Sequence, residues 1–336
     1  MRWRRRYRVP EGVETFAVHE DLLTVIVGER LITYELATGR ERWRVRGLAG
    51  LTYDPHHTVL SASGSVVFLE LSYHSLTSSP DVFAFDRATG ERLWKVWSHF
   101  SPLAVVGNRV YLLEDDYPTD QNYPGRLKVT TVDLRSGELL GRRVHHLNKT
   151  SNSVHNHPNP WAYDKVLIYK GVLYAEARRL YTGKPMNVAR FALEIQGVSR
   201  PAFVEPGTNL EWLAGPYQDK LFVLEHGGGT RRFLVGNVGG SSLSPVRFND
   251  TYQIGANPIS HLDLVGNGLY VGHTDGRFVA VDVQTGRASF HFQADVKNFG
   301  QTHVVADTLI VQAGSQLLAF ALPEELGGPD HQRTSP

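Results

Sequence analysis

The chain has 336 residues, of which 41% are hydrophobic, and its 35 basic and 34 acidic side chains give a formal net charge of +1. This balance argues against a general nucleic-acid-binding protein, which usually carries a basic excess on one face. The chain has no cysteine, which excludes disulfides, thiolate metal sites and a cysteine nucleophile. The length allows one large domain or two ordinary ones.

The N-terminal segment MRWRRRYRVPEG is basic, and no apolar stretch of signal-peptide length follows it. No apolar run is long enough to span a bilayer. We therefore expect a cytoplasmic protein, although a wrongly assigned start codon would leave export open. In an extended strand four arginines would share one face: Arg2, Arg4, Arg6 and Arg8. They could form an anion-binding or membrane-surface patch, but we favour a solvated outer strand.

A unit of about fifteen residues recurs at 31–45, 82–96, 129–144 and 278–292. Each copy is an alternating apolar run, an acidic residue, a Thr-Gly or Ser-Gly turn, and a second alternating run. This pattern predicts a β-hairpin. The first three turn glycines lie 51 and 47 residues apart and the last lies 149 residues further on, about three periods of ~50 in the range of propeller repeats. Two degenerate units are therefore expected between 147 and 250.

Three positions recur within each unit. An acidic residue stands three positions before the turn Thr or Ser, where a carboxylate can accept backbone N–H groups of the turn. The glycine can take a positive φ without steric cost. A large aromatic residue four positions later can wedge against the neighbouring blade, although Gly141 breaks this pattern in the third unit. The repeat residues are Glu35, Gly39, Trp43, Asp86, Gly90, Trp94, Asp133, Gly137, Asp282, Gly286 and Phe290.

These residues resemble the quinoprotein-type (PQQ-like) β-propeller repeat, in which a strand is followed by Asp-x-x-Thr-Gly and a strand that carries Trp. The resemblance implies an all-β propeller of four-stranded blades. It implies little about function, because the family includes dehydrogenases, outer-membrane assembly lipoproteins, sensor domains and binding proteins.

The units end near residues 47, 98, 146, 199, 250 and 293, and the remainder, 294–322, holds only three strands. The segment 3–9 alternates like a strand and has no blade of its own. We therefore predict that residues 1–9 supply the outer strand of the last blade and close the ring. The prediction is one β-propeller domain over 1–322 with seven blades, six or eight remaining open, and a disordered tail over 323–336.

Three irregular stretches are candidates for function. In 149–161, His155 and His157 would point the same way and could chelate a metal, but we favour a connecting loop whose side chains satisfy its own backbone. The acidic insertion at 114–125 has oxygen ligands for Ca²⁺ but no known calcium-loop spacing, which favours a long hairpin loop. The Gly-rich run at 226–233 lies between strands, which favours a hairpin turn over a phosphate cradle.

Residues near the starts of the inner strands would line the central channel, whose mouth is a common place for propeller ligands. Such residues often only hydrogen-bond neighbouring blades. The candidate ligand-binding residues at this level are His57, His99, Asp164, Trp212, His261 and Gln301, together with His155 and His157 of the loop.

The sequence contains none of the compact catalytic motifs for serine hydrolases, zinc proteases or phosphate loops. We therefore predict a non-enzymatic binding or protein-interaction scaffold, a monomer whose partner is another protein or a small ligand at the channel mouth. The alternative is an enzyme, either a quinone-dependent oxidoreductase or a His-based lyase or hydrolase. No cofactor is expected, PQQ with Ca²⁺ included, because none of that family's metal ligands can be matched. An envelope assembly factor is disfavoured by the missing lipid-anchor cysteine.

Overall fold

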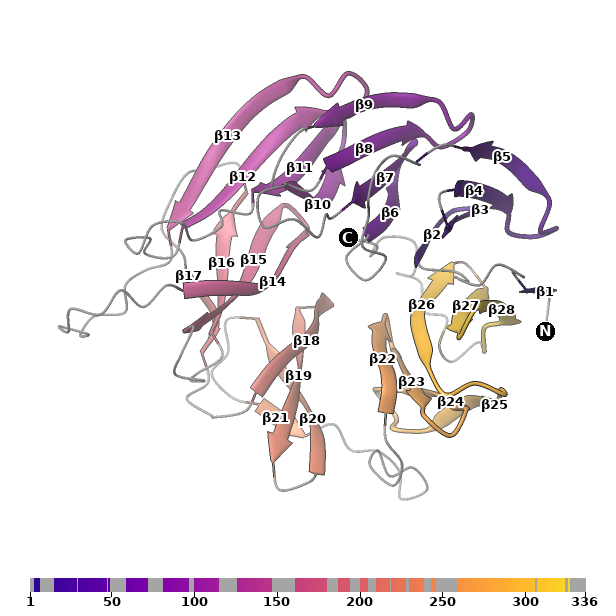
Figure 1. Ribbon diagram of the computed structural model, residues 1–336. Coiled ribbons are helices and arrows are strands. Elements are labelled where there is room, and N and C mark those ends of the chain that lie inside the picture. The colour runs from indigo at the N-terminus through magenta and orange to yellow at the C-terminus, as the bar shows by residue number, and fades with distance from the viewer. Residues whose placement is uncertain are drawn as a thin grey trace. The chain divides into compact units, whose positions relative to one another are not determined.

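The computed structural model describes residues 3–6, 15–28, 30–46, 48, 59–71, 81–96, 100–114, 126–146, 161–179, 187–193, 200–204, 210–217, 219–227, 230–238, 243–245, 259–305, 307–323 and 326. The chain divides into two compact units, Met1–Ser98 with Arg247–Ser335, and His99–Val246 with Pro336. Throughout the described ranges, every regular element is a β-strand, apart from a single helical-turn residue at 326. The strands form seven antiparallel sheets of four strands each (Figure 1).

The first unit contains four of the sheets. Their strands are β2(Thr15–His19), β3(Leu22–Val27), β4(Arg30–Glu35) and β5(Glu41–Val45); β6(Val59–Ser63), β7(Val66–Leu71), β8(Asp81–Asp86) and β9(Arg92–Val96); β22(Ile259–Val265), β23(Gly268–His273), β24(Arg277–Asp282) and β25(Ala288–Gln293); and β26(Phe299–Val305), β27(Thr308–Ala313), β28(Gln316–Ala321) and β1(Trp3–Arg6).

The second unit contains the other three sheets. Their strands are β10(Phe100–Val106), β11(Arg109–Glu114), β12(Arg126–Asp133) and β13(Leu139–His146); β14(Trp161–Tyr169), β15(Val172–Arg179), β16(Asn187–Ala192) and β17(Arg200–Val204); and β18(Leu210–Tyr217), β19(Lys220–Gly227), β20(Thr230–Asn237) and β21(Leu243–Pro245). The run at 226–233 is a hairpin in which Gly227 pairs with Thr230, as predicted. The insertion loop at 115–125 lies outside the described residues.

The four repeat units are the outer hairpins β4–β5, β8–β9, β12–β13 and β24–β25. In each turn the glycine N–H donates to the carbonyl of the acidic residue, and each glycine has φ between +68° and +75°. Asp86, Asp133 and Asp282 also accept two backbone N–H groups of the turn on Oδ1, at 2.7–3.0 Å. The predicted turn chemistry is confirmed for these three aspartates.

Glu35 differs from the three aspartates. Its longer carboxylate accepts hydrogen bonds from the Thr38 hydroxyl at 2.7 Å and from the guanidinium groups of Arg40 and Arg42. The hydrogen bonds from Arg40 and Thr38 lower the pKa of Glu35 to about 2. The prediction that the acidic side chain accepts backbone N–H groups is therefore wrong for this unit. The additional methylene of Glu35 places its carboxylate beside the side chains of Thr38, Arg40 and Arg42 instead.

The N-terminal strand β1 completes the sheet of β26–β28. Trp3 to Arg6 pair antiparallel with Ala319 to Gln316 of β28. Residues 3–6 of the predicted strand 3–9 are described, and residues 7–9, like Arg2 and Arg8 of the arginine face, lie outside the described residues. The last three strands of the chain therefore have the fourth strand that the sequence required.

Two predicted boundaries change. The fourth unit was expected to end near 199, but its outer strand β17 is Arg200–Val204, because the degenerate unit lacks the short Thr-Gly turn. The tail was expected to be disordered from 323, but Leu326 is fully buried within the core cluster of the last sheet, and its N–H donates to Pro323. The packed chain therefore extends at least to Leu326, and residues 327–336 lie outside the described residues.

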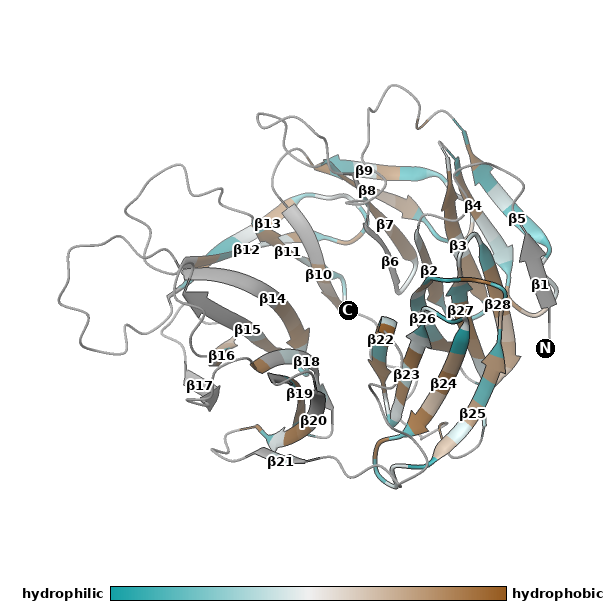
Figure 2. Ribbon diagram, turned by 60° about the horizontal axis from the view of Figure 1, so that its bottom comes forward, coloured by the Kyte–Doolittle hydropathy of each residue, from teal (hydrophilic) through white to brown (hydrophobic). Residues whose placement is uncertain are grey.

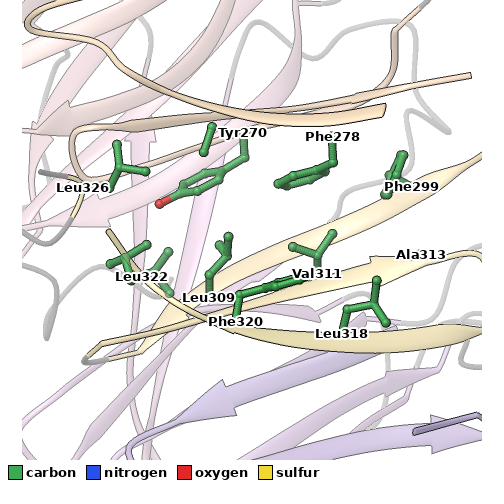
Figure 3. Packing of buried hydrophobic residues seen from close by; sticks show 12 residues of the cluster. Tyr270, Phe278, Phe299, Leu309, Val311, Ala313, Leu318, Phe320, Leu322 and Leu326 are labelled. Atoms are coloured by element: carbon green, nitrogen blue, oxygen red, sulfur yellow. The ribbon is translucent and has the colours of Figure 1, made fainter. Parts of the chain in front are cut away.

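The cores lie between neighbouring sheets. The middle strands are apolar on both faces, as in β3, and the outer strands alternate, as in β5; Figure 2 shows this as brown middle strands and teal in β5 and β9. Between the sheets of β22–β25 and β26–β28, apolar side chains from both sheets fill the space (Figure 3). The cluster includes Tyr270, Phe278, Phe299, Leu309, Val311, Phe320 and Leu326.

The aromatic wedge predicted for the repeat is seen at Trp43. Its ring packs with Phe83 and Phe85 of the next sheet, and its Nε1 donates to the carbonyl of Arg87 at 2.8 Å. A Cβ added at Gly90 would lie 2.6 Å from the indole ring. The turn glycine of one sheet therefore makes room for the tryptophan of the sheet before it.

Candidate functional site

The first strands of neighbouring sheets lie side by side in the first unit. Contacts join β22 to β26, β26 to β2, and β2 to β6. Successive side chains of a strand point to opposite faces, so His261 and Asp263 share one face of β22, and Gln301 and His303 share one face of β26. This alternation brings polar side chains from two strands together at the junction of β22 and β26.

Asp263 links the two strands. Its Oδ2 lies 2.6 Å from His261 Nε2 and accepts the backbone N–H of Thr302 at 2.7 Å. The carboxylate thus fixes the orientation of the imidazole and bonds to a residue 39 positions away. If Nε2 carries the proton, the neutral ring of His261 presents Nδ1 as an acceptor. Such a pair can hold a ligand donor or move a proton, and it also ties β22 to β26.

His303 lies one residue beyond this contact. Its ring packs edge-on against Phe16 of β2, with 4.8 Å between ring centroids. Desolvation lowers the pKa of His303 to about 4, and the nearby Asp263 only partly opposes this effect. The imidazole is therefore neutral at physiological pH and joins the packing of β26 against β2.

Two weaker polar contacts complete the junction. The hydroxyl of Thr15 donates to Gln301 Oε1 at 3.3 Å, and the backbone N–H of Phe299 donates to the hydroxyl of Ser260 at 3.3 Å. We call His261, Asp263, Gln301, Thr302 and His303 the inner-strand cluster. Its members connect three successive sheets of the first unit.

Two of the predicted channel-level residues lie on neighbouring inner strands, His261 on β22 and Gln301 on β26. Trp212 is buried and packs in the core of the second unit with Leu221 and Val223. Asp164 belongs to β14, at a register shift of the ladder with β15. The other candidates lie outside the described residues: His57, His99, His155 and His157.

The sequence analysis missed Asp263, Thr302 and His303. The signal was present, because ISHLDLV and FGQTHVV each place polar residues two positions apart in a strand that precedes two apolar strands. A polar face on the first strand of a blade is the pattern that would have found Asp263 and His303.

Within the described ranges, no group of three or more His, Asp or Glu residues gathers as a metal site would require. The pair His155 and His157 is outside those ranges, so the metal hypothesis is not tested. The described residues contain no helix that is long and apolar enough to cross a membrane.

Comparison with known protein families shows which family this chain belongs to. A family model described as outer membrane protein assembly factor BamB matches residues 2–173, just over half of the chain. The chain belongs to this family. This confirms the PQQ-like repeat resemblance that the outer hairpins carry. No curated protein matches the chain.

Two solved structures are similar to this chain in fold. The crystal structure of BamB from Moraxella catarrhalis matches 92% of this chain and 85% of its own, with 16% identity and a TM-score of 0.50. The computationally designed protein Ika8 matches 93% of this chain and 96% of its own, with 12% identity and a TM-score of 0.56. At these identities the likeness concerns the fold, which supports the β-propeller class.

Proposed function

We propose that the chain is a non-enzymatic PQQ-like propeller that acts as a protein-interaction scaffold. The observation that carries the proposal is the match of residues 2–173 to a family described as an assembly factor. The inner-strand cluster supports it, because the Asp263 carboxylate bonds to groups of two neighbouring strands. Propeller scaffolds place loops from every blade around a rigid centre, which suits them to binding.

The test is co-purification. The full chain, tagged and expressed in its native cells, is expected to retain a protein partner at a fixed stoichiometry through size exclusion. The designed protein Ika8, which has a similar fold, serves as the control bait. If every protein retained by the chain is also retained by Ika8, the scaffold proposal is wrong.

The finer architecture is part of the proposal. We infer that the seven sheets are the blades of one closed ring, and that β1 closes it by pairing with β28. The pairing of Trp3–Arg6 with Gln316–Ala319 supports this inference. Deleting residues 1–9 should lower the thermal stability of the full chain, because β28 would become an open sheet edge. A deletion variant with unchanged melting temperature would contradict closure by β1.

Acid–base catalysis is the second candidate function, and the His261–Asp263 pair is the observation that favours it. Substrate profiling for lyase and hydrolase activity, with His261→Gln as the control variant, tests this candidate. We propose that no quinone is bound; a chromophore and dye-linked alcohol oxidation after incubation with PQQ and Ca²⁺ would contradict that.

The remaining expectations concern the setting of the protein. We propose a cytoplasmic monomer that does not bind nucleic acid, in line with the balanced charge. Cell fractionation and light scattering test the compartment and the oligomeric state. Recovery of the chain in an envelope fraction would contradict the compartment and would bring its setting close to that in the family's description.

A further inference from the structure

The chain continues after the last strand that it supplies to the sheet of β26–β28. In the sheet of β22–β25, the N–H of Val283 donates to the carbonyl of Asn267 at 2.9 Å, and the chain then turns into the outer strand β25. In the last sheet, the N–H of Leu322 makes the corresponding bond to Asp307 at 2.7 Å, but the outer strand is β1. The residues after Leu322 are therefore not needed to complete this sheet.

Leu326 anchors this additional segment. Its side chain is fully buried, and it belongs to the same core cluster as Leu322. Its N–H donates to the carbonyl of Pro323, within the same segment, at 3.0 Å. Among the described contacts, the buried side chain is therefore what holds Leu326 to the two sheets. A segment that is held by few buried contacts opens at a lower free-energy cost than a strand inside a sheet.

A buried tyrosine hydroxyl lies on the side of the cluster where this segment packs. Tyr270 of β23 is fully buried in the same cluster, and Figure 3 shows its hydroxyl pointing towards the side of Leu322 and Leu326. Among the described residues, no group forms a hydrogen bond with this oxygen. A Cβ added at Gly268 would lie 2.5 Å from it. Burial raises the pKa of the Tyr270 hydroxyl, so the group is neutral at physiological pH.

The closed position of the segment is unfavourable for this hydroxyl. The cluster around it is apolar, whereas a buried water needs two or more polar partners. A buried hydroxyl without a hydrogen bond has a higher free energy than the same hydroxyl in water. Burial of the Leu326 side chain therefore favours the closed segment, and the hydroxyl of Tyr270 opposes it. The balance of the two effects places the open and closed positions closer in free energy than burial of the leucine alone would.

We propose that the segment anchored by Leu326 is a strap that opens and closes on the sheets of β22–β25 and β26–β28 in the native protein. The closed strap covers Tyr270 and the apolar side chains around it. The open strap exposes this apolar surface and lets water reach the hydroxyl, while the sheets stay folded. The protein therefore has an apolar surface that is covered until the strap opens. The inference goes beyond the proposed scaffold function and does not depend on it.

Amide hydrogen exchange of the full chain, followed by NMR, measures the opening. The protection factor of the Leu326 N–H should be at least about tenfold lower than those of the β27–β28 ladder, because local opening costs less than global unfolding. Tyr270→Phe removes the hydroxyl that opposes closure, and should raise the protection factor of the Leu326 N–H at least about fivefold. Tyr34→Phe, at a buried tyrosine of a different core cluster, is the matched control and should leave this protection factor unchanged.

A second variant tests what the open strap exposes. Leu326→Asp should hold the strap open and increase the fluorescence of the dye anilinonaphthalene sulfonate, which binds exposed apolar surface. Ala321→Asp, at an exposed position just before the strap, is the control and should not increase it.

Three results would overturn the inference. The first is a Leu326 N–H that is as well protected as the β27–β28 ladder. The second is a Tyr270→Phe variant whose Leu326 N–H is protected equally or less, because the hydroxyl would then be satisfied in the closed state. The third is a folded Leu326→Asp variant that binds no more dye than the control. If circular dichroism shows that Leu326→Asp is unfolded, the Tyr270→Phe result decides.

Discussion

In the outer hairpins the aspartate side chains bond to backbone groups of their own turn, whereas in the inner-strand cluster Asp263 also bonds to the neighbouring sheet. Asp282 accepts N–H groups two and three residues away, while Asp263 accepts one from Thr302, 39 residues away. The first kind of bond shapes a repeating unit and can recur with every copy. The second kind depends on which side chains meet at one junction, so it is specific to that junction.

The outer hairpin and the inner strand of a sheet therefore have different structural roles. The outer hairpin sets the spacing and the packing of neighbouring sheets, as the contact of Trp43 with Gly90 shows. The inner strand is free to carry different polar residues, because its ladder is formed by backbone groups whatever the side chain. Four substitutions test this division, and they are ordered by expected effect.

The largest effect is expected from Trp43→Ala in the outer hairpin. The substitution removes a buried ring and the indole bond to the carbonyl of Arg87, and should lower the free energy of unfolding by about 4 kcal/mol. Urea denaturation measures it. The control Leu139→Ala, at an exposed position, should change stability by no more than about 0.5 kcal/mol. Equal effects for the two variants would show that the wedge is dispensable.

The second largest effect is expected from His303→Gln, which should change how the stability of the protein depends on acidic pH. The pKa of His303 is about 4 in the folded chain against an ordinary 6.5, so the unfolded chain binds more protons between these values. The stability linked to the neutral ring is complete above pH 6.5 and is lost as the pH falls towards 4, by about 3 kcal/mol in all. His303→Gln should therefore show a shallower loss of stability over this range. Identical pH profiles for wild type and variant would contradict the assignment.

Gly90→Ala should have an intermediate effect. The residue has φ +75°, and the added Cβ would meet the Trp43 ring, so we expect a loss of about 2 kcal/mol from strain and overpacking together. Gly64→Ala in the same sheet is the matched control, because φ is +57° and nothing lies within 4 Å. It should lose about 1 kcal/mol from backbone strain alone. Thermal melts that do not distinguish the two would argue against the wedge contact.

The smallest effect is expected from Asp282→Ala. The change leaves the N–H groups of Gln284 and Thr285 without their carboxylate acceptor, at a cost of about 1 kcal/mol. Asp282→Asn keeps an acceptor oxygen and should retain most of the stability. If the two variants are equally destabilised in urea, the charge rather than the hydrogen bonds stabilises the turn.

The sequence predicts the outer hairpins because their interactions are local. A turn with Asp, Thr and Gly at fixed spacing specifies its own hydrogen bonds, and the pairs that follow are set by alternation. Glu35 shows the limit, since one additional methylene redirects its carboxylate to Thr38 and two arginines. His261 and Gln301 could be placed at the right level, because both stand near the start of a strand. Their bonding partners could not, because the meeting of Asp263 with Thr302 depends on how two sheets pack.

The pairing of β1 with β28 has a consequence for biosynthesis. It joins positions 3 and 319, so β1 can pair with β28 only after the strands between them have been synthesised. The entropic cost of closing a loop grows only with the logarithm of its length, so the free-energy cost of this pairing is modest. Contacts between residues this far apart in the sequence nevertheless form late in folding. A nascent chain that stops early would show an unpaired strand edge at each end. A chain interrupted before residue 316 thus lacks this four-residue ladder.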